Sequence, residues 1–117
     1  MPRIPMHEVS DLGSPFEVTT KEIEISGLGD NEILAPIPGK KIVVTGYLMV
    51  STLAVIVRFK NQGAGALSGP MTMAANSAIA YAGSPYAPAF ISGVGKGLDA
   101  NLTVATGVSG HIAYFTE

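Results

Sequence analysis

From Asp30 to Lys60 the chain reads DNEILAPIPGKKIVVTGYLMVSTLAVIVRFK. Its alternating and β-branched residues predict three strands, and a Pro-Gly pair separates the first from the second. Pro38 presets the φ angle of the second position of a β-turn, and Gly39 accepts the positive φ that a type II turn requires at the third position. Almost no side chain in this segment is suited to catalysis. We therefore expect a scaffold that works through its surface.

The strand predicted over residues 41–50 is apolar on both faces. Such a strand is covered on both sides, either by a second sheet or by another subunit. Gly46 in its middle indicates a bulge or a close backbone approach. The strand that follows alternates more regularly, and its inward side chains are predicted to be Leu53, Val55, Val57 and Phe59.

Weaker strand patterns flank this segment on both sides. Residues 21–25 alternate, with Ile23 and Ile25 on one face, and Asp30-Asn31 is interpreted as an ordinary turn. The stretch 70–82 is ambiguous, because its turn pair Asn76-Ser77 favours two short strands whereas its alanines favour a short helix. Four further strands are predicted. One has Ile33, Ala35 and Ile37 on a single face, one is a brief edge strand over 89–91, one alternates from Leu98 to Val104, and one closes the chain over 107–115. Eight or nine short strands with dense turns predict an all-β fold, an antiparallel β-sandwich or jelly roll.

The chain of 117 residues is long enough for one domain with its own core. We place the β-sandwich domain at residues 20–117 and an extended N-terminal arm at residues 1–19, where prolines are frequent and no period is sustained. Apolar side chains on such an arm are expected to lie along a surface, its own or that of a neighbour. The predicted capsid or subunit contacts of the arm are Arg3, Ile4, Met6, Val9, Leu12 and Phe16.

Composition excludes several classes of function. The chain has no cysteine, which excludes disulfides, thiolate metal sites and a cysteine nucleophile. Hydrophobic residues make up 47% and charged residues only 14%, against about 25% charged in an average soluble domain. The N-terminus lacks the apolar run of a secretory signal, and the apolar stretch 47–57 is too short to span a membrane. We expect a soluble protein made in a cytoplasm, with no membrane partner.

Charge is distributed unevenly along the chain. Residues 1–32 contain seven acidic and two basic side chains, whereas residues 33–117 contain five basic and two acidic ones. This asymmetry is compatible with an acidic arm docking on a neighbour and equally with a solvated terminus. A modest basic patch lacks interleaved aromatic residues, so no nucleic-acid partner is expected. That patch consists of Lys40, Lys41, Arg58 and Lys60.

No constellation of residues indicates an enzyme, a metal or a cofactor. The two histidines, His7 and His111, are far apart in the sequence and lack the spacing of metal ligands. Glu22 and Glu24 lie on the solvent face of a predicted strand, where paired carboxylates both stay ionised. Residues 93–97 read GVGKG, but the phosphate-loop ending and the following helix are absent. We expect a β-turn there and no catalytic site.

Several segments together show a family resemblance. They are residues 29–44 (GDNEILAPIPGKKIVV), the paired strands of 47–60, LSGPM at 67–71, GKGL at 95–98 and VSGHIAY at 108–114. With this series the chain resembles small β-sandwich virion proteins from the structural gene clusters of tailed bacteriophages. Within that group it is most similar to the jelly-roll decoration, or cement, proteins that sit on capsid shells, often as trimers. The resemblance covers residues 21–117 and leaves the arm out.

This resemblance implies a function without catalytic residues or cofactors. It implies a protein that decorates and stabilises the capsid surface of a virion, with the major capsid protein and further copies of itself, as a homotrimer, for partners. The candidates for subunit contact are Tyr47, Met49, Tyr86 and Phe90. The alternative is a tail, neck or fibre component, or a glycan-binding module in which Tyr81, Tyr86 and Phe90 stack on sugar rings.

Overall fold

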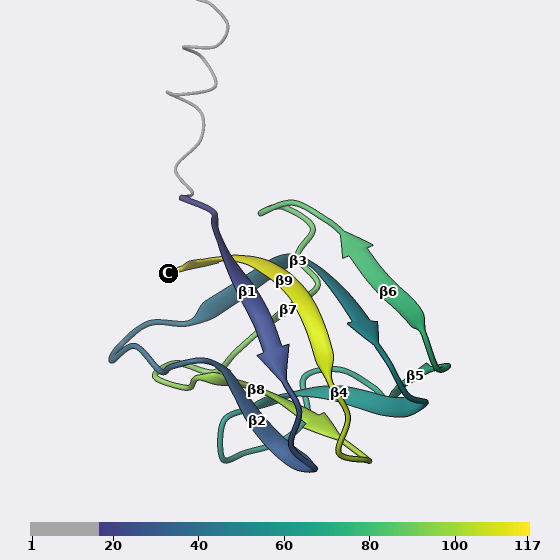
Figure 1. Cartoon of the computed structure of the whole chain (residues 1–117). Helices are drawn as coiled ribbons and strands as arrows, with labels where there is room; N and C mark the ends of the chain where they lie inside the picture. The colour runs from purple at the N-terminus through teal and green to yellow at the C-terminus, as the bar shows by residue number, and fades with distance from the viewer. Residues whose placement is uncertain (1–16) are drawn as a thin grey trace, which may run out of the picture.

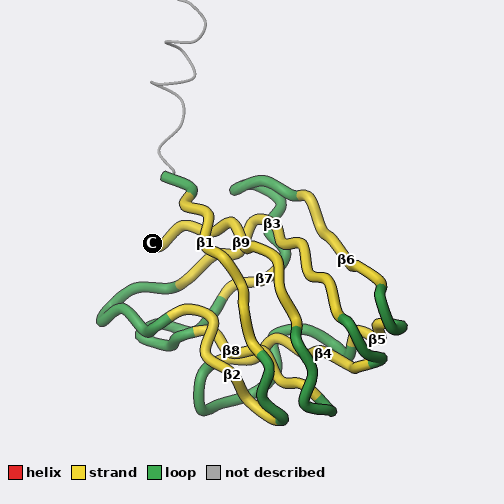
Figure 2. The backbone as a smooth tube through the Cα atoms, viewed as in Figure 1, coloured by secondary structure: helices red, strands yellow, loops and turns green. Residues whose placement is uncertain are grey.

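The computed structural model describes residues 17–117 and is all-β, with nine strands and no helix in that part of the chain (Figures 1 and 2). The prediction of an all-β fold with eight or nine short strands is therefore confirmed. No segment of the described chain forms a helix that could cross a membrane. The strands are β1 (Thr19–Ile25), β2 (Gly29–Leu34), β3 (Ile42–Ser51), β4 (Val55–Asn61), β5 (Met71–Met73), β6 (Ser77–Ala82), β7 (Phe90–Ile91), β8 (Leu98–Leu102) and β9 (Val108–Thr116).

The strands form two antiparallel sheets. Sheet A has the order β1-β9-β3-β6, with β7 also paired to β3, and sheet B has the order β2-β8-β4-β5. Each strand of the first half pairs with one of the second half: β1 with β9, β2 with β8, β3 with β6 and β7, and β4 with β5. This is a long hairpin rolled up into two sheets, which is the jelly-roll arrangement.

The core lies between the sheets. Alternate residues of each strand point inward, so Val55, Val57 and Phe59 of β4 meet residues such as Met49 and Ile112 of sheet A. All five of these side chains are buried. The predicted bulge at Gly46 is confirmed, because the register between β3 and β9 shifts between Val44 and Gly46. This shift changes which residues of β3 point outward.

The structure confirms two of the turns that were predicted from local sequence. Gly39 has a φ of 72°, and the Lys40 amide donates to the Ile37 carbonyl at 3.1 Å, as expected for the predicted Pro-Gly turn. The stretch 70–82 forms β5 and β6 around a turn in which Asn76 has a φ of 55°. The alternative of a short helix there is therefore excluded.

Four details of the predicted strands are wrong. Asp30 and Asn31 lie inside β2 and not in a turn, and β2 ends at Leu34, which leaves Ile37 exposed beyond it. Leu53 is not an inward residue of β4, because the chain reverses at residues 52–54 and β4 begins only at Val55. On β3 both faces are buried only before the bulge, and Val50 is exposed.

Candidate interaction surfaces

Chemistry-bearing side chains are scattered in the described chain. Among residues 17–117 no three His, Cys, Asp or Glu side chains gather in a way that could hold a metal ion. Three exposed surfaces of this part of the chain differ in character: one end of the sandwich, the outer face of sheet A and the outer face of sheet B.

The predicted subunit contacts lie mostly inside the sandwich. Met49 is fully buried, and Tyr47 and Phe90 pack against the core around Phe59, with ring centroids 5.2 Å and 4.7 Å from it. This placement argues against Met49 as a contact residue, since its side chain reaches no surface. Tyr86, in contrast, is 77% exposed, so its contact with a partner stays a prediction.

The predicted contacts of the arm, Arg3, Ile4, Met6, Val9, Leu12 and Phe16, lie outside the described residues. The described chain begins two residues before β1, whose first residue is Thr19. Contact of the arm with a neighbour stays a prediction.

One end of the sandwich is apolar and uncharged. Paired strands are antiparallel, and β6 and β7 both run opposite to β3. The loops β1–β2, β3–β4, β5–β6 and β8–β9 therefore gather at the same end, as Figure 1 shows at the lower right. Leu28, Leu53 and Val104 stand on three of these loops and are 68%, 54% and 39% exposed. None of the four loops contains a charged residue; they are 26–28, 52–54, 74–76 and 103–107. We call these loops the apolar loop end.

Hydrogen bonds hold these loops in place. The hydroxyls of Thr52 and Thr106 lie 3.1 Å apart and join the β3–β4 loop to the β8–β9 loop. The Ser51 hydroxyl donates to the carbonyl of Leu53 at 2.6 Å. The side chain of Asn31 closes the β1–β2 loop by hydrogen bonds with Gly27 in both directions. The exposed apolar side chains are thus presented on a fixed frame.

The outer face of sheet A is built from small and uncharged residues. On β6 the outward residues are Ala78, Ala80 and Ala82, and they stand beside Val50, Leu48 and Gly46 of β3. The small side chains leave a shallow depression over β3, β6 and β9. In the described chain, outward charges on this sheet belong to β1, in Glu22 and Glu24.

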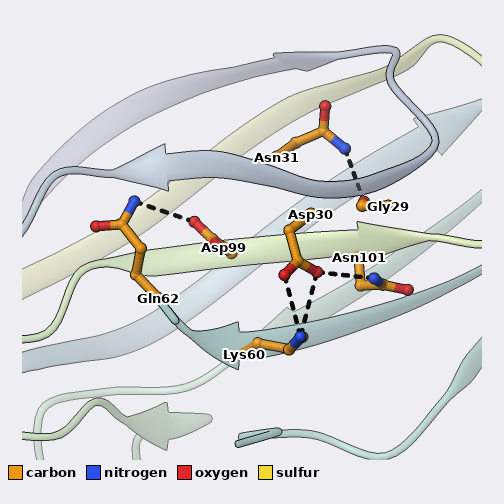
Figure 3. A network of polar contacts seen from close by, with 7 residues as sticks. All are labelled: Gly29, Asp30, Asn31, Lys60, Gln62, Asp99 and Asn101. Carbon is orange, nitrogen blue, oxygen red and sulfur yellow. Dashed lines mark hydrogen bonds and ion pairs between the residues drawn. The ribbon is translucent and has the colours of Figure 1, made fainter. Parts of the chain in front are cut away.

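The outer face of sheet B is polar by contrast (Figure 3). Asp30 accepts hydrogen bonds from the Asn101 amide at 2.7 Å and from Lys60, whose ammonium lies 3.1 Å from its nearer oxygen. The Gln62 amide donates to Asp99 at 3.2 Å and to Glu32 at 2.6 Å. Side chains of β2, β4 and β8 are thereby linked across three strands.

The pKa values of the two aspartates in this network are shifted in opposite directions. The hydrogen bond from Asn101, followed by the one from Lys60, lowers the pKa of Asp30 because both stabilise the carboxylate. Burial raises the pKa of Asp99, and the neighbouring carboxylates add to that rise while Gln62 opposes it. Because the two shifts are opposite, the stability that this network contributes depends on pH.

Comparison with known proteins gives only distant likenesses. No protein-family model and no curated protein sequence matches the chain. Among solved structures, it is similar to a chain of the capsid asymmetric unit of cyanophage Pam1, at a TM-score of 0.48 and 10% identity over 86% of this chain and 84% of that one. It is also similar to a chain of the Bacillus endospore appendages, which form disulfide-linked pili (0.44; 16% identity; 88% of both chains).

A third similar chain comes from the virus-like particle of the extra small virus of the giant freshwater prawn Macrobrachium rosenbergii (0.41; 13% identity; 98% of this chain and 83% of that one). At such low identity and TM-scores below 0.5, these likenesses assign no function. The jelly-roll arrangement of this chain rests on its own strand pairing.

The apolar loop end does not follow from the sequence patterns. These patterns indicate no surface role for Leu28 or Val104, and they predict Leu53 as a core residue. The available signal was that the loops contain apolar residues and no charge, whereas turns of soluble domains are usually polar.

Proposed function

We propose that this chain is a structural protein of a tailed-phage virion that decorates and stabilises the capsid shell through protein–protein contacts. Its partners would be the major capsid protein and further copies of itself, in a homotrimer on the capsid surface, and its role would not be enzymatic. The single observation that carries the proposal is the apolar loop end, with Leu28, Leu53 and Val104 exposed on loops without charge.

Exposed apolar residues that gather in one place, as distinct from single ones, are typical of interaction sites. Loops held by hydrogen bonds such as that between Thr52 and Thr106 lose little conformational freedom on binding, which favours association. A jelly roll suits such a role but also occurs in lectins and cupins, so the fold alone does not select the function. The family resemblance of residues 21–117 supports the virion role. A protein that binds the assembled shell and not its free subunits stabilises the shell by mass action.

The alternative of a glycan-binding module receives less support. Of the three aromatic residues considered for sugar stacking, Phe90 packs against Phe59 in the interior. Tyr81 and Tyr86 are exposed, and the Tyr81 hydroxyl donates to the carbonyl of Ala87 at 3.0 Å. A tail, neck or fibre position would use the same surfaces, and the binding experiment below separates it from the capsid.

The proposal is tested by sedimentation of the purified protein with empty shells of the major capsid protein that is proposed as its partner. We expect the wild-type protein to pellet with the shells, and Leu53→Asp to bind at least about tenfold more weakly, a loss of about 1.4 kcal/mol. Val94→Asp is the matched control, because Val94 is at least as exposed as Leu53 but lies in the β7–β8 turn at the opposite end of the sandwich.

Equal binding by both aspartate variants and the wild type would refute the role of the apolar loop end. Absence of wild-type binding to shells, together with binding to tail or neck particles, would replace the capsid by the alternative position in the virion.

A further inference from the structure

The two sheets have five edge strands, because β6 and β7 both flank β3 on the side away from β9. Four of the five are protected against pairing with another chain, and β7 is protected by its length of only two residues. An unprotected edge offers a row of free backbone donors and acceptors, which proteins block with charges, prolines or short strands. β1 contains Lys21, Glu22 and Glu24, β2 contains Asp30 and Glu32, and β5 has three residues and follows Pro70. β6 reads SAIAYA, with no charge and no proline. In Figure 2 it runs along the outside of the sheet, beside β3.

The backbone of β6 has unused hydrogen-bonding groups on its open side. The carbonyl oxygen of Tyr81 faces β3, since a Cβ placed on Gly46 would lie 2.9 Å from it. Because successive residues of an antiparallel strand direct their backbone groups to opposite sides, those of Ala78, Ala80 and Ala82 face the open edge. No described residue makes a backbone hydrogen bond to β6 outside the pairing with β3.

We infer that β6 pairs with β6 of a second copy of this chain, antiparallel and across a two-fold axis through Ala80. In this register Ala80 lies opposite Ala80 of the second copy, and Ala78 lies opposite its Ala82. The three alanines would exchange about six backbone hydrogen bonds. On the inner side Ile79 would stand opposite Tyr81 of the second copy, a branched–aromatic cross-strand pair that favours antiparallel association.

The sequence of β6 favours a second copy over another occupant. Alanine at 78, 80 and 82 is symmetric about Ala80, so the edge is complementary to itself, as an isologous contact requires. The outer face of sheet A carries no charge on β6 or β3, so two copies meet there without like-charge repulsion. The charged edges β1 and β2 make a head-to-tail pairing less favourable.

The geometry of the β6 pairing determines how strongly the copies should associate and in what number. A single strand pair buries less than a standard interface of about 1,600 Å², so association in solution should be weak. A two-fold contact cannot close a trimer, and it would join copies into assemblies with an even number of chains. On a surface that holds many copies close together, the same weak contact would be strengthened by the high local concentration.

Sedimentation equilibrium between about 10 μM and 1 mM tests this inference, in the range expected for a weak interface. We expect reversible association of the wild type to an even number of copies. Ala80→Lys and Ala80→Glu would each place like charges opposite one another on the axis, so each variant should lose this step and have half the wild-type mass. An equimolar mixture of the two variants should regain it, because Lys and Glu then face each other.

Thr20→Lys on β1 is the control, since it adds the same charge to the opposite, exposed edge of sheet A. It should associate like the wild type, and circular dichroism should show the same fold for every variant. A wild type that stays monomeric, an odd number of copies, an Ala80 variant that associates unchanged, or a mixture that does not reassociate would each overturn the inference. Shells are absent from this experiment, so its result does not bear on capsid binding. A wild type that stops at a trimer would support the proposed homotrimer and overturn the pairing of β6.

Discussion

At the scale of single residues, sheet B places the Asp30 carboxyl where its ionised form is stabilised and the Asp99 carboxyl where its ionised form is disfavoured. Asp99 is only 6% exposed, and burial raises its pKa, whereas hydrogen bonds to Asn101 and Lys60 lower the pKa of Asp30. A raised carboxyl pKa means that the folded state binds the proton more tightly than the unfolded state. Asp99 therefore favours folding below its ordinary pKa, and this contribution is lost as the pH rises through the folded-state value. Asp30 behaves oppositely: its contribution is present at neutral pH and is lost as the pH falls.

From this we predict that Asp99→Asn stabilises the protein at pH 7. The amide removes a buried charge next to Glu32 and can still accept the hydrogen bond from Gln62. We expect the melting temperature to rise by about 2–6 °C, which corresponds to roughly 1 kcal/mol in a domain of this size. The difference should vanish near pH 3, where the wild-type carboxyl is protonated. Calorimetry from pH 3 to pH 7 measures both values.

Asp30→Asn is the matched control in the same network. It should lower the melting temperature slightly at pH 7, because the ion pair with Lys60 is lost, and this difference should also disappear at low pH. A loss of stability in Asp99→Asn that is constant across the pH range would contradict the assignment, since it would indicate a lost hydrogen bond and not a relieved charge.

At the scale of elements, β9 is held close to β3 at Gly110. The φ of this residue is 151°, and a Cβ there would collide with the carbonyl oxygen of Leu48. We predict that Gly110→Ala destabilises the protein by at least about 2 kcal/mol, since backbone must move at the centre of sheet A. Urea unfolding measures the change in free energy. Gly107→Ala, just before β9, has open space and should change it by less than about 0.5 kcal/mol.

The sequence was informative where an element is determined by its own residues. The turn at Pro38-Gly39 and the bulge at Gly46 were predicted because a positive φ or a missing side chain points to glycine locally. The prediction that Leu53 points into the core is wrong because alternation continues into the hairpin turn, and nothing in the residues of that turn marks the end of the strand. Asp30 and Asn31 are residues typical of turns, but pairing of β2 with β8 draws them into a strand. Tertiary pairing therefore decided the cases in which local preference failed.

At the scale of the whole molecule, the strands that pair are far apart in the sequence. β1 lies along β9, with Thr19 opposite Tyr114, and no local pattern predicts such a partner. The same long-range pairing brings Leu28, Leu53 and Val104 to one end. For this reason the class of fold was predictable from alternation and turns, whereas the apolar loop end and the open edge of β6 were not. Both surfaces exist only once the hairpin is rolled up.

This topology predicts opposite effects of shortening the two ends of the chain. Removing residues 108–117 deletes β9, which lies between β1 and β3 and is the only strand among residues 17–117 that pairs with β1. We therefore expect an unfolded chain without the β-sheet signal in circular dichroism. Removing residues 1–16 leaves all nine strands of the described chain, so we expect a folded protein with a cooperative melt.

If the arm contacts a neighbour as its sequence predicts, the variant without residues 1–16 should fail to sediment with capsid shells while Val94→Asp still does so. A folded variant without residues 1–16 that decorates shells normally would refute the role of the arm, and the apolar loop end would then be sufficient for binding.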